Sequence, residues 1–385
     1  MNIVLLSPHF PPNFYNFAVA LQRLDVSVLG IGDALYHELR PELRNALVEY
    51  YRTDDMGDYD QLVRACGYFT HRYGKLDRFE SHNEFWLGTD ARIRADFNIP
   101  GPKPRDMDKI QHKSKMKRIF TRAKIDVARG KVTRTLRAAR KFIAEVGYPV
   151  IVKPDVGMGA SATYKIHSDE ELQHFFAEKP PVTYFMEEFI SGDLYSFDGL
   201  VDQDGHIVFY TAHFFNNGIM EVVNQGLDMY YYSLREIPAD LKEAGFKAVK
   251  AFDLRARFFH IEFFRTPDRL LLLELNMRPP GGLTMDMFNY ANNIDLYQGW
   301  ADVVVANRFD IEYTRPYHCV HIGRKWQRHY RLDHEAVLRE YAPLLVHHER
   351  ISPVMAPAIG DYGYLLRSPD LAELQQAIAG ILAVV

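Results

Sequence analysis

The stretch from residue 270 to residue 282 constrains the fold of this chain more than any other segment. Four consecutive leucines are followed by Glu274, Asn276 and Arg278, which occupy every second position. Alternate side chains of a β-strand point to the same side of a sheet, so these three polar groups are expected to share one face. An apolar run over residues 258–264 precedes them across a turn segment. Two such runs separated by a turn predict a β-hairpin.

The register of this hairpin follows from the spacing. With a three-residue loop at 267–269, residue 266 pairs with residue 270, so paired residue numbers add up to 536, and 262 + 274 is also 536. Glu262 and Glu274 are therefore expected to face each other, where two negative charges repel unless a cation lies between them. Two carboxylates and the amide oxygen of Asn276 are hard donors that suit Mg²⁺ or Mn²⁺. The alternative is a solvated hairpin face that carries two unrelated carboxylates.

Composition narrows the class of protein. With 47% hydrophobic and 25% charged residues over 385 positions, the chain is expected to form two or three globular domains. Its 46 basic and 50 acidic residues give a formal net charge of −4, which gives no reason to expect a nucleic-acid partner. The two cysteines, Cys66 and Cys319, form no disulfide framework. Together with the lack of a signal-like or membrane-spanning apolar run, this predicts a cytoplasmic protein that does not associate with membranes.

The first third of the chain predicts an α/β domain. An apolar run at 1–7, a helical pattern at 13–24 and a second apolar run at 26–32 predict a strand, a helix and a second strand parallel to the first. The loop between them lacks the GxGxxG spacing, so a Rossmann-like domain without a dinucleotide is expected. Prolines at 99–104 mark a boundary. The basic segment 106–145 is then expected to be helical, with most of its lysines on a solvated face.

A buried-looking strand at 148–154 carries one lysine, Lys153, near its end. It is followed by small residues that include Gly157, Gly159 and Ser161. A loop of this kind can bring backbone N–H groups close to phosphate oxygens, although a small-residue hairpin turn is a common alternative. A lysine within an apolar strand must reach the edge of the sheet or meet an anion. The combination therefore favours a phosphate site.

Further strands are predicted at 183–190, 195–201 and 206–214, so the middle of the chain is expected to be an antiparallel α+β domain. Beyond residue 300 a strand is predicted at 311–323 and a helix at 370–382. The predicted domains are 1–105, 106–186, 187–305 and 306–385. The fold class expected from this order is α/β followed by α+β.

In their order along residues 80–303, these elements resemble the ATP-grasp superfamily. The resemblance rests on a helix lysine, a strand lysine with a glycine-rich loop, the sequence Glu-Glu-Phe-Ile-x-Gly, a glutamate, and finally Glu-x-Asn-x-Arg-Pro. It implies a Rossmann-like preceding domain, two subdomains that hold ATP between them, and a small C-terminal region. It also implies ATP and Mg²⁺ as ligands.

The resemblance implies a role for each matching residue. Lys113 would be the first phosphate lysine, with Lys109 and Lys115 as alternatives, and Lys153 the second. The loop with Gly157, Gly159 and Ser161 would cover the phosphates. Glu187 and the backbone of Glu188 and Ile190 would hold the adenine edge. Many relatives have a ribose-binding glutamate where this chain has Leu194, and Asp193 is the substitute we expect. Glu262, Glu274 and Asn276 would bind the metal, and Arg278 would steady the reacting groups; the implied catalytic residues are thus Arg278 and Lys153.

The implied function is an ATP-dependent carboxylate–amine ligase of the amino-acid ligase branch. The Arg-Pro-Pro-Gly-Gly turn at 278–282 and the modest chain length carry this resemblance. Its partners would be a small-molecule carboxylate and an amine, with amino acids expected for both, and a homodimer is left open. The alternatives are a biotin-carboxylase-like or carbamoyl-phosphate-forming enzyme and a non-catalytic ATP-binding regulatory module. The six histidines between residues 318 and 348 are expected to be scattered, not a metal cluster.

Overall fold

The N-terminal part of the chain forms a parallel α/β domain. The structure is a computed structural model that describes residues 1–157 and 162–385. Four parallel strands lie in the order β3-β2-β1-β4. Their bounds are Asn2–Leu6 (β1), Ser27–Gly32 (β2), Glu49–Arg52 (β3) and Arg78–Glu80 (β4), with helices Tyr15–Gln22 (α1), Pro41–Ala46 (α2), Tyr59–Tyr73 (α3) and Leu87–Asp96 (α4). The apolar runs of β1 and β2 are buried, as expected for strands covered by helices. The Rossmann-like prediction is confirmed.

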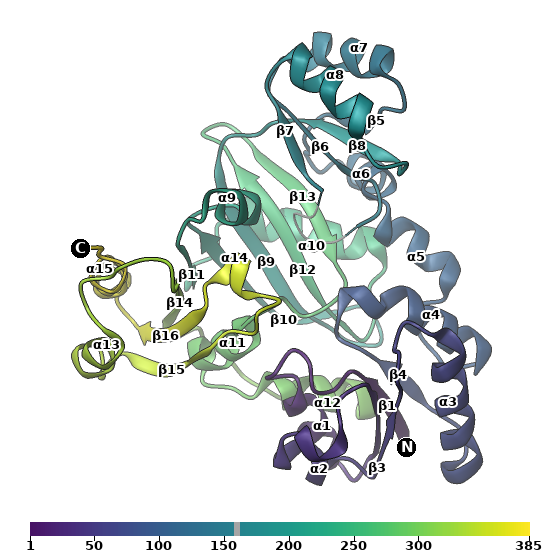
Figure 1. Cartoon of the computed structure of the whole chain (residues 1–385). Coiled ribbons are helices and arrows are strands. Elements are labelled where there is room, and N and C mark those ends of the chain that lie inside the picture. Colours follow the sequence, from purple (N-terminus) through teal and green to yellow (C-terminus); the bar gives the residue numbers. More distant parts are fainter. Residues whose placement is uncertain (158–161) are drawn as a thin grey trace.

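A second, smaller sheet follows. Its strands lie in the order β5-β8-β6-β7, and all neighbouring pairs are antiparallel. Their bounds are Gly130–Val132 (β5), Val150–Pro154 (β6), Tyr164–Ile166 (β7) and Tyr184–Glu188 (β8). Helices Leu136–Val146 (α7) and Asp169–Glu178 (α8) pack on it, and Pro104–Gln111 (α5) and Lys113–Arg122 (α6) lead into it (Figure 1). The prediction of an uninterrupted helical segment over 106–145 is wrong, because β5 pairs with β8 within it.

The rest of the chain builds one large sheet of antiparallel neighbours in the order β13-β12-β9-β10-β11-β14-β16-β15. The strands are Asp193–Val201 (β9), Ile207–Phe215 (β10), Met229–Ser233 (β11), Arg257–Arg265 (β12), Leu270–Asn276 (β13), His318–Arg324 (β14), Leu345–Arg350 (β15) and Tyr362–Ser368 (β16). The helices are Ile219–Gln225 (α9), Ala239–Phe252 (α10), Thr284–Asn292 (α11), Leu296–Ala306 (α12), His334–Glu340 (α13), Ala356–Ile359 (α14) and Leu371–Ile381 (α15).

Two expectations for the C-terminal part are modified by this sheet. The strand predicted at 311–323 is shorter, since β14 begins only at His318. The last three strands also continue the sheet that β9 to β13 begin, because β14 pairs with β11. The helix predicted at 370–382 is confirmed as α15, with Asp370 as its N-cap. The boundaries at 105, 186 and 305 stay predictions.

The N-terminal domain is joined to the large sheet by a shared core and by buried charges. Phe17 of α1 stacks edge-on against Trp300 of α12 with 5.0 Å between ring centroids. Glu80, at the end of β4, lies 3.0 Å from both Arg94 of α4 and Arg257 of β12. Burial would raise the pKa of Glu80, but the two guanidinium groups hold it at about 2. This pairing fixes the carboxyl end of β4 against the strand that carries Glu262.

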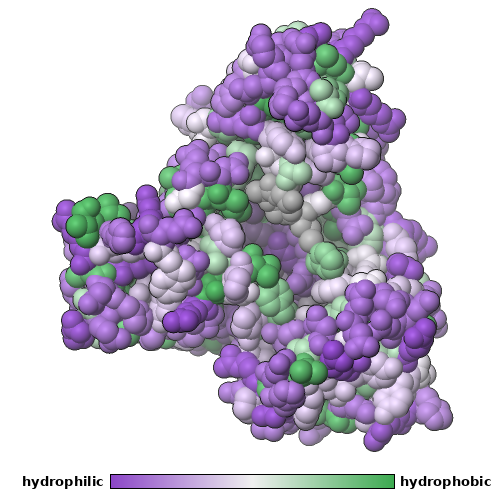
Figure 2. Space-filling model, viewed as in Figure 1, coloured by the Kyte–Doolittle hydropathy of each residue, from purple (hydrophilic) through white to green (hydrophobic). Residues whose placement is uncertain are grey.

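Between these parts the molecule is hollowed. The face shown in Figure 2 has a depression at its centre, between the lobe of the small sheet and the N-terminal domain. Within the described part of the chain, no helix is long and apolar enough to cross a membrane.

Candidate functional site

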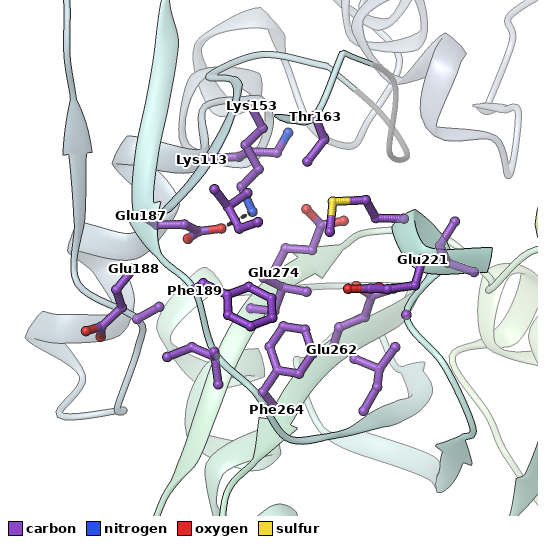
Figure 3. A pocket seen from close by; sticks show the side chains of 18 residues that line it. Lys113, Lys153, Thr163, Glu187, Glu188, Phe189, Glu221, Glu262, Phe264 and Glu274 are labelled. Atoms are coloured by element: carbon purple, nitrogen blue, oxygen red, sulfur yellow. Dashed lines mark ion pairs between the residues drawn. The ribbon is translucent and has the colours of Figure 1, made fainter. Parts of the chain in front are cut away.

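A cavity lies between the small sheet and the β12–β13 hairpin, with α9 along one side (Figure 3). It encloses about 930 Å³, part of which is open to solvent. The side chains that line it come from α6, β6, β8, α9 and both strands of the hairpin. The predicted site residues among them are Lys113, Lys153, Glu187, Glu188, Ile190, Glu262 and Glu274. The fold therefore collects in one cavity charged groups that lie far apart in the sequence.

Of the three candidate helix lysines, Lys113 is the one that lines the cavity. It begins α6, and its Nζ donates a hydrogen bond of 2.8 Å to the carbonyl oxygen of Gly157. Lys109 donates instead to the last carbonyl of α10 at 2.9 Å. Lys115 is paired with the exposed carboxylate of Asp108. The geometry thus favours Lys113 for contact with a ligand in the cavity.

The strand lysine Lys153 is part of a buried group of three charges. Its Nζ lies 2.5 Å from Glu187 Oε1, and Lys117 Nζ contacts the other oxygen of Glu187. Burial would raise the pKa of Glu187, but the two ammonium groups hold it at about 2. Lys117 is an exception to the expectation that most lysines of this segment lie on a solvated face, because its side chain is only 8% exposed. Its position four residues after Lys113, and so on the same side of α6, is the signal that could have identified it.

The segment that follows β8, residues 189–192, is called the hinge, and it lies at an apolar slot beside these charges. Ile151, Phe189, Leu194, Met220 and Phe264 contribute apolar lining. The Glu188 carboxylate is held by Arg129, which donates from its backbone N at 2.8 Å and its Nε at 2.7 Å. A slot of this kind suits a planar apolar group such as a purine base. Asp193, the expected ribose contact, is exposed and lies outside the lining, whereas Leu194 is part of it.

The hairpin places its two glutamates opposite each other as predicted. Glu262 pairs with Glu274, and His260 pairs with Asn276, so paired residue numbers add up to 536 at the site. The predicted three-residue loop is wrong: the last pair is Arg265 with Leu270, which leaves four residues in the loop. A β-bulge after Glu262 restores the register, because β13 contributes one extra residue there.

Behind Glu262 lies a chain of buried polar groups on the same face of the large sheet. His260 Nε2 is 3.2 Å from Glu262 Oε1, and its Nδ1 is 2.5 Å from Asp198. The second oxygen of Asp198 lies 2.8 Å from Nδ1 of His213. Burial would lower the pKa of His260, but the two carboxylates raise it to about 9. A positively charged imidazole between Asp198 and Glu262 orients the Glu262 carboxylate toward the cavity.

Asn276 and Arg278 continue the hairpin toward the N-terminal domain and meet Glu84 there. Arg278 donates to Glu84 Oε2 from Nε at 3.1 Å and from Nη2 at 3.0 Å. In the orientation that satisfies its surroundings, the Asn276 amide nitrogen lies 3.1 Å from both oxygens of Glu84. The amide oxygen is then turned to Glu274 Oε1 at 3.4 Å. Glu84 was not predicted as a site residue, because it lies 194 positions before Arg278.

The donor set fits a hard divalent cation. Burial and the facing Glu262 carboxylate raise the pKa of Glu274, as expected for two like charges forced together. The Asn276 amide oxygen, 3.4 Å from Glu274 Oε1, is a further hydrogen-bond acceptor that faces the Glu274 carboxylate without a donor between them. A cation between these three oxygens would relieve both contacts, and oxygen-only ligands suit Mg²⁺. The role of these residues as metal ligands stays a prediction.

Other predicted groups lie elsewhere. Gly159 and Ser161 fall outside the described residues, whereas Gly157 accepts from Lys113. Over residues 1–157 and 162–385, the His, Cys, Asp and Glu side chains close enough to share a metal ion are Asp202, Asp204 and His206, at an exposed turn. The C-terminal histidines form no such group within those ranges, although His334 and His348 lie side by side with 5.5 Å between ring centroids.

Comparisons with known proteins agree with this architecture. Residues 146–286 match the family model described as the ATP-grasp domain. The L-arginine-specific L-amino acid ligase of Bacillus subtilis is 24% identical over 271 residues, which cover 66% of this chain and 64% of that protein. The chain thus spans less than two thirds of the length of the curated relatives that it matches.

Two solved structures share the fold along nearly the whole chain. An L-amino acid ligase from Bacillus licheniformis superposes with a TM-score of 0.74 at 15% identity and covers 100% of this chain and 98% of its own. The N5-carboxyaminoimidazole synthetase of Staphylococcus aureus in complex with ADP gives 0.75 at 15% identity, with 97% and 95% covered. The fold expected from the order of motifs is therefore confirmed.

Proposed function

We propose that this chain, which carries an ATP-grasp domain, is an ATP-dependent carboxylate–amine ligase that forms an amide bond and releases ADP and phosphate. The observation that supports this function is the convergence of Lys113, Lys153, Glu262 and Glu274 on one cavity. Two lysines beside a pair of carboxylates are the charges needed to bind a metal–nucleotide complex. The apolar slot at the hinge offers a place for the base in the same cavity.

In the proposed reaction, the γ-phosphoryl group of ATP is transferred to an oxygen of the substrate carboxylate, and ADP leaves. Both reactants are anions, so their approach requires nearby positive charge. Lys113 and Lys153 would contact the phosphates, and Arg278 would contact the carboxylate. When bound by Glu262, Glu274 and Asn276, Mg²⁺ or Mn²⁺ would offset further phosphate charge.

The second step is attack of an amine on the acyl phosphate. The amine nitrogen forms a bond to the carbonyl carbon, and phosphate leaves with the electron pair of the broken bond. Glu187 and the backbone of Glu188 and Ile190 are proposed to hold the base. Asp193, which the sequence suggested for the ribose, is exposed and outside the cavity lining, so the proposal gives it no ligand contact. Gly157, Gly159 and Ser161 are proposed to contact the phosphates. Amide formation from two amino acids is the version of this chemistry that we favour.

Hydroxylamine tests the first step without knowledge of the natural amine. The protein is incubated with ATP, Mg²⁺, hydroxylamine and one carboxylate from a panel of amino acids and other acids, and both ADP and acyl hydroxamate are measured. Equal amounts of the two products are expected, and omission of Mg²⁺ should abolish both. Replacing Lys153 by methionine should lower the rate at least about 100-fold, whereas the exposed Lys250→Met control should not.

Three outcomes would contradict the ligase. ADP release with bicarbonate alone would favour the biotin-carboxylase-like or carbamoyl-phosphate-forming alternative. ATP binding without carboxylate-dependent ADP release would favour a regulatory module. Full activity of the Lys153→Met variant would show that the reaction does not take place in this cavity.

A further inference from the structure

We propose that a second cavity of this protein binds a small anion that carries phosphate groups, and that this anion lowers the affinity of the cavity in Figure 3 for ATP. The second cavity lies between α6 and the small sheet and is called the basic cavity here. Binding of the anion does not depend on the proposed reaction. Its effect on ATP rests on the nucleotide site that the proposed function assigns to Lys113 and Lys153.

The basic cavity encloses about 1520 Å³, part of which is open to solvent. Its lining comes from α6, the segment 125–129, β5, the C-terminal half of α7, and β8. α6 contributes the positions i, i+3, i+4, i+7 and i+8 counted from Ser114, which share one side of a helix. A different side of α6 packs into the core through Met116 and Phe120. The core therefore holds the helix while one polar side of it faces the cavity.

Positive charge dominates the lining of the basic cavity. Both carboxylates of the lining already have a cationic partner, since Asp126 lies 3.7 Å from Arg269 and Glu145 lies 3.9 Å from Lys131. Against these two carboxylates stand five cations, namely Lys117, Arg118, Arg122, Arg129 and Lys131.

Two of these cations have no charged partner within the described part of the chain. The ion pairs that α6 makes there involve Lys115 and Lys117. Arg118 and Arg122 are exposed and lie one turn apart on the same side of the helix. A guanidinium group presents a planar fork of N–H donors that matches phosphate oxygens. Two such groups one turn apart therefore favour a ligand with phosphate groups.

The floor of the basic cavity is apolar. Ile125, Phe142 and Phe185 line it and are buried. The Lys131 ammonium group lies against this floor, 5.1 Å from the centre of the Phe142 ring. Bulk water is thus kept from one side of the cations, and an anion interacts more strongly with charges that lie beside a low-dielectric surface.

Lys117 connects the basic cavity to the cavity in Figure 3. Phe185 and Glu187 are two positions apart on β8 and point to the same side of the sheet, where Phe185 lines the basic cavity and Glu187 lines the other. Lys117 Nζ lies 5.6 Å from the centre of the Phe185 ring and contacts Glu187. Glu187 Oε1 in turn lies 2.5 Å from Lys153, an ion pair drawn in Figure 3. A chain of charges therefore runs from one cavity to the other.

The sign of the coupling follows from this chain of charges. A phosphate group bound at Arg118 attracts the neighbouring Lys117 ammonium group and weakens its contact with Glu187. The Glu187 carboxylate then holds the Lys153 ammonium group more firmly and keeps it away from nucleotide phosphates. The anion should therefore lower the affinity for ATP, and by linkage ATP should lower the affinity for the anion by the same factor.

Fructose bisphosphate serves as the probe, because it presents phosphate groups and no base. Titration calorimetry measures the Kd of ATP with Mg²⁺ in excess and without any carboxylate substrate, over a series of probe concentrations. The Kd of ATP is expected to rise about five- to tenfold and then to level off, because a coupled site saturates. Fructose without phosphate groups should leave the Kd unchanged.

A double variant makes the test specific to the basic cavity. Arg118→Gln/Arg122→Gln should raise the probe concentration that gives half of the effect at least about tenfold. Its melting temperature and its Kd of ATP without the probe should match those of the wild type. The control is Arg137→Gln, which changes an exposed arginine of α7 outside the lining and should respond to the probe as the wild type does.

Three results would overturn the inference. The first is a Kd of ATP that the probe does not change. The second is a Kd that keeps rising without a plateau, equally in the wild type and the double variant, which would show direct competition at Lys113 and Lys153. The third is a wild-type response of the double variant. Failure of the ligase reaction would instead be seen in the hydroxylamine assay, because the binding assay contains no carboxylate substrate.

Discussion

Replacing Glu274 by glutamine is expected to stabilise the ligand-free protein and to abolish its stabilisation by MgATP. Glu262 and Glu274 are a directly opposed cross-strand pair. The Cβ atoms of such pairs are about 5 Å apart, and two unit charges at that distance repel by roughly 3 kcal/mol at an effective dielectric constant of about 20. Nearby Lys153 and His260 offset part of this repulsion. We therefore expect a net gain of about 1 kcal/mol in the ligand-free variant.

The effect on the liganded protein has the opposite sign. A ligand present at 100 times its Kd stabilises the folded state by about 2.7 kcal/mol. For a chain of 385 residues this corresponds to a rise in melting temperature of roughly 3 °C. The glutamine variant loses one of the two carboxylates that are proposed to hold the metal, so this rise should disappear.

The measurement is a thermal melt at fixed ATP over a series of Mg²⁺ concentrations. Wild type, Glu274→Gln and Glu243→Gln are compared, the last being an exposed glutamate paired with Lys247 on α10. A lower melting temperature of the ligand-free Glu274→Gln variant would refute the argument from repulsion. A Mg²⁺-dependent rise of normal size in that variant would refute the metal assignment.

Three other changes test separate parts of the structure. In Lys117→Met, Glu187 keeps Lys153 as its remaining lysine partner, and the Glu187 carboxylate should hold the Lys153 ammonium group away from the nucleotide phosphates. Titration calorimetry should therefore show ATP affinity lowered about tenfold. The pKa of Glu187 is about 2, below its ordinary value of 4.5. The stability that the ionised carboxylate contributes is therefore complete above pH 4.5 and is lost between pH 4.5 and 2. Circular dichroism should show acid unfolding in that range, with a weaker pH dependence in Glu187→Gln. Gly323→Ala would bring a Cβ within 1.9 Å of a backbone carbonyl oxygen and should lower the free energy of unfolding by more than about 3 kcal/mol, whereas Gly67→Ala, on a helix with nothing within 4 Å, should raise it by about 0.5 to 1 kcal/mol.

The hairpin illustrates how far sequence reasoning reaches. The alternation of polar residues after four leucines, together with an assumed three-residue loop, predicted correctly that Glu262 faces Glu274. The loop was predicted one residue too short. A β-bulge in β13 compensates for that error in the register. The bulge could not be recognised from the sequence, because its extra residue, Leu273, is apolar like its neighbours.

The groups that sequence reasoning missed share a different property. Lys117 and Glu84 were not recognised because their partners lie 70 and 194 positions away. In the sequence, Lys117 is one of many lysines on a basic helix, so its spacing from Lys113 was not distinctive, and contact with β8 shows that it is buried. Glu84 lies in a connecting segment whose composition indicates no role.

By itself, the sequence determined the parallel first domain, the antiparallel hairpin and the face that carries the carboxylates. Each of these depends on local periodicity, which the backbone geometry of strands and helices dictates. The tertiary structure alone decided which of three helix lysines reaches the cavity, that Glu187 is held between two lysines, and that Glu84 meets Arg278. These contacts join segments that are distant along the chain, so they depend on how the domains pack and not on the spacing of residues within any one of them.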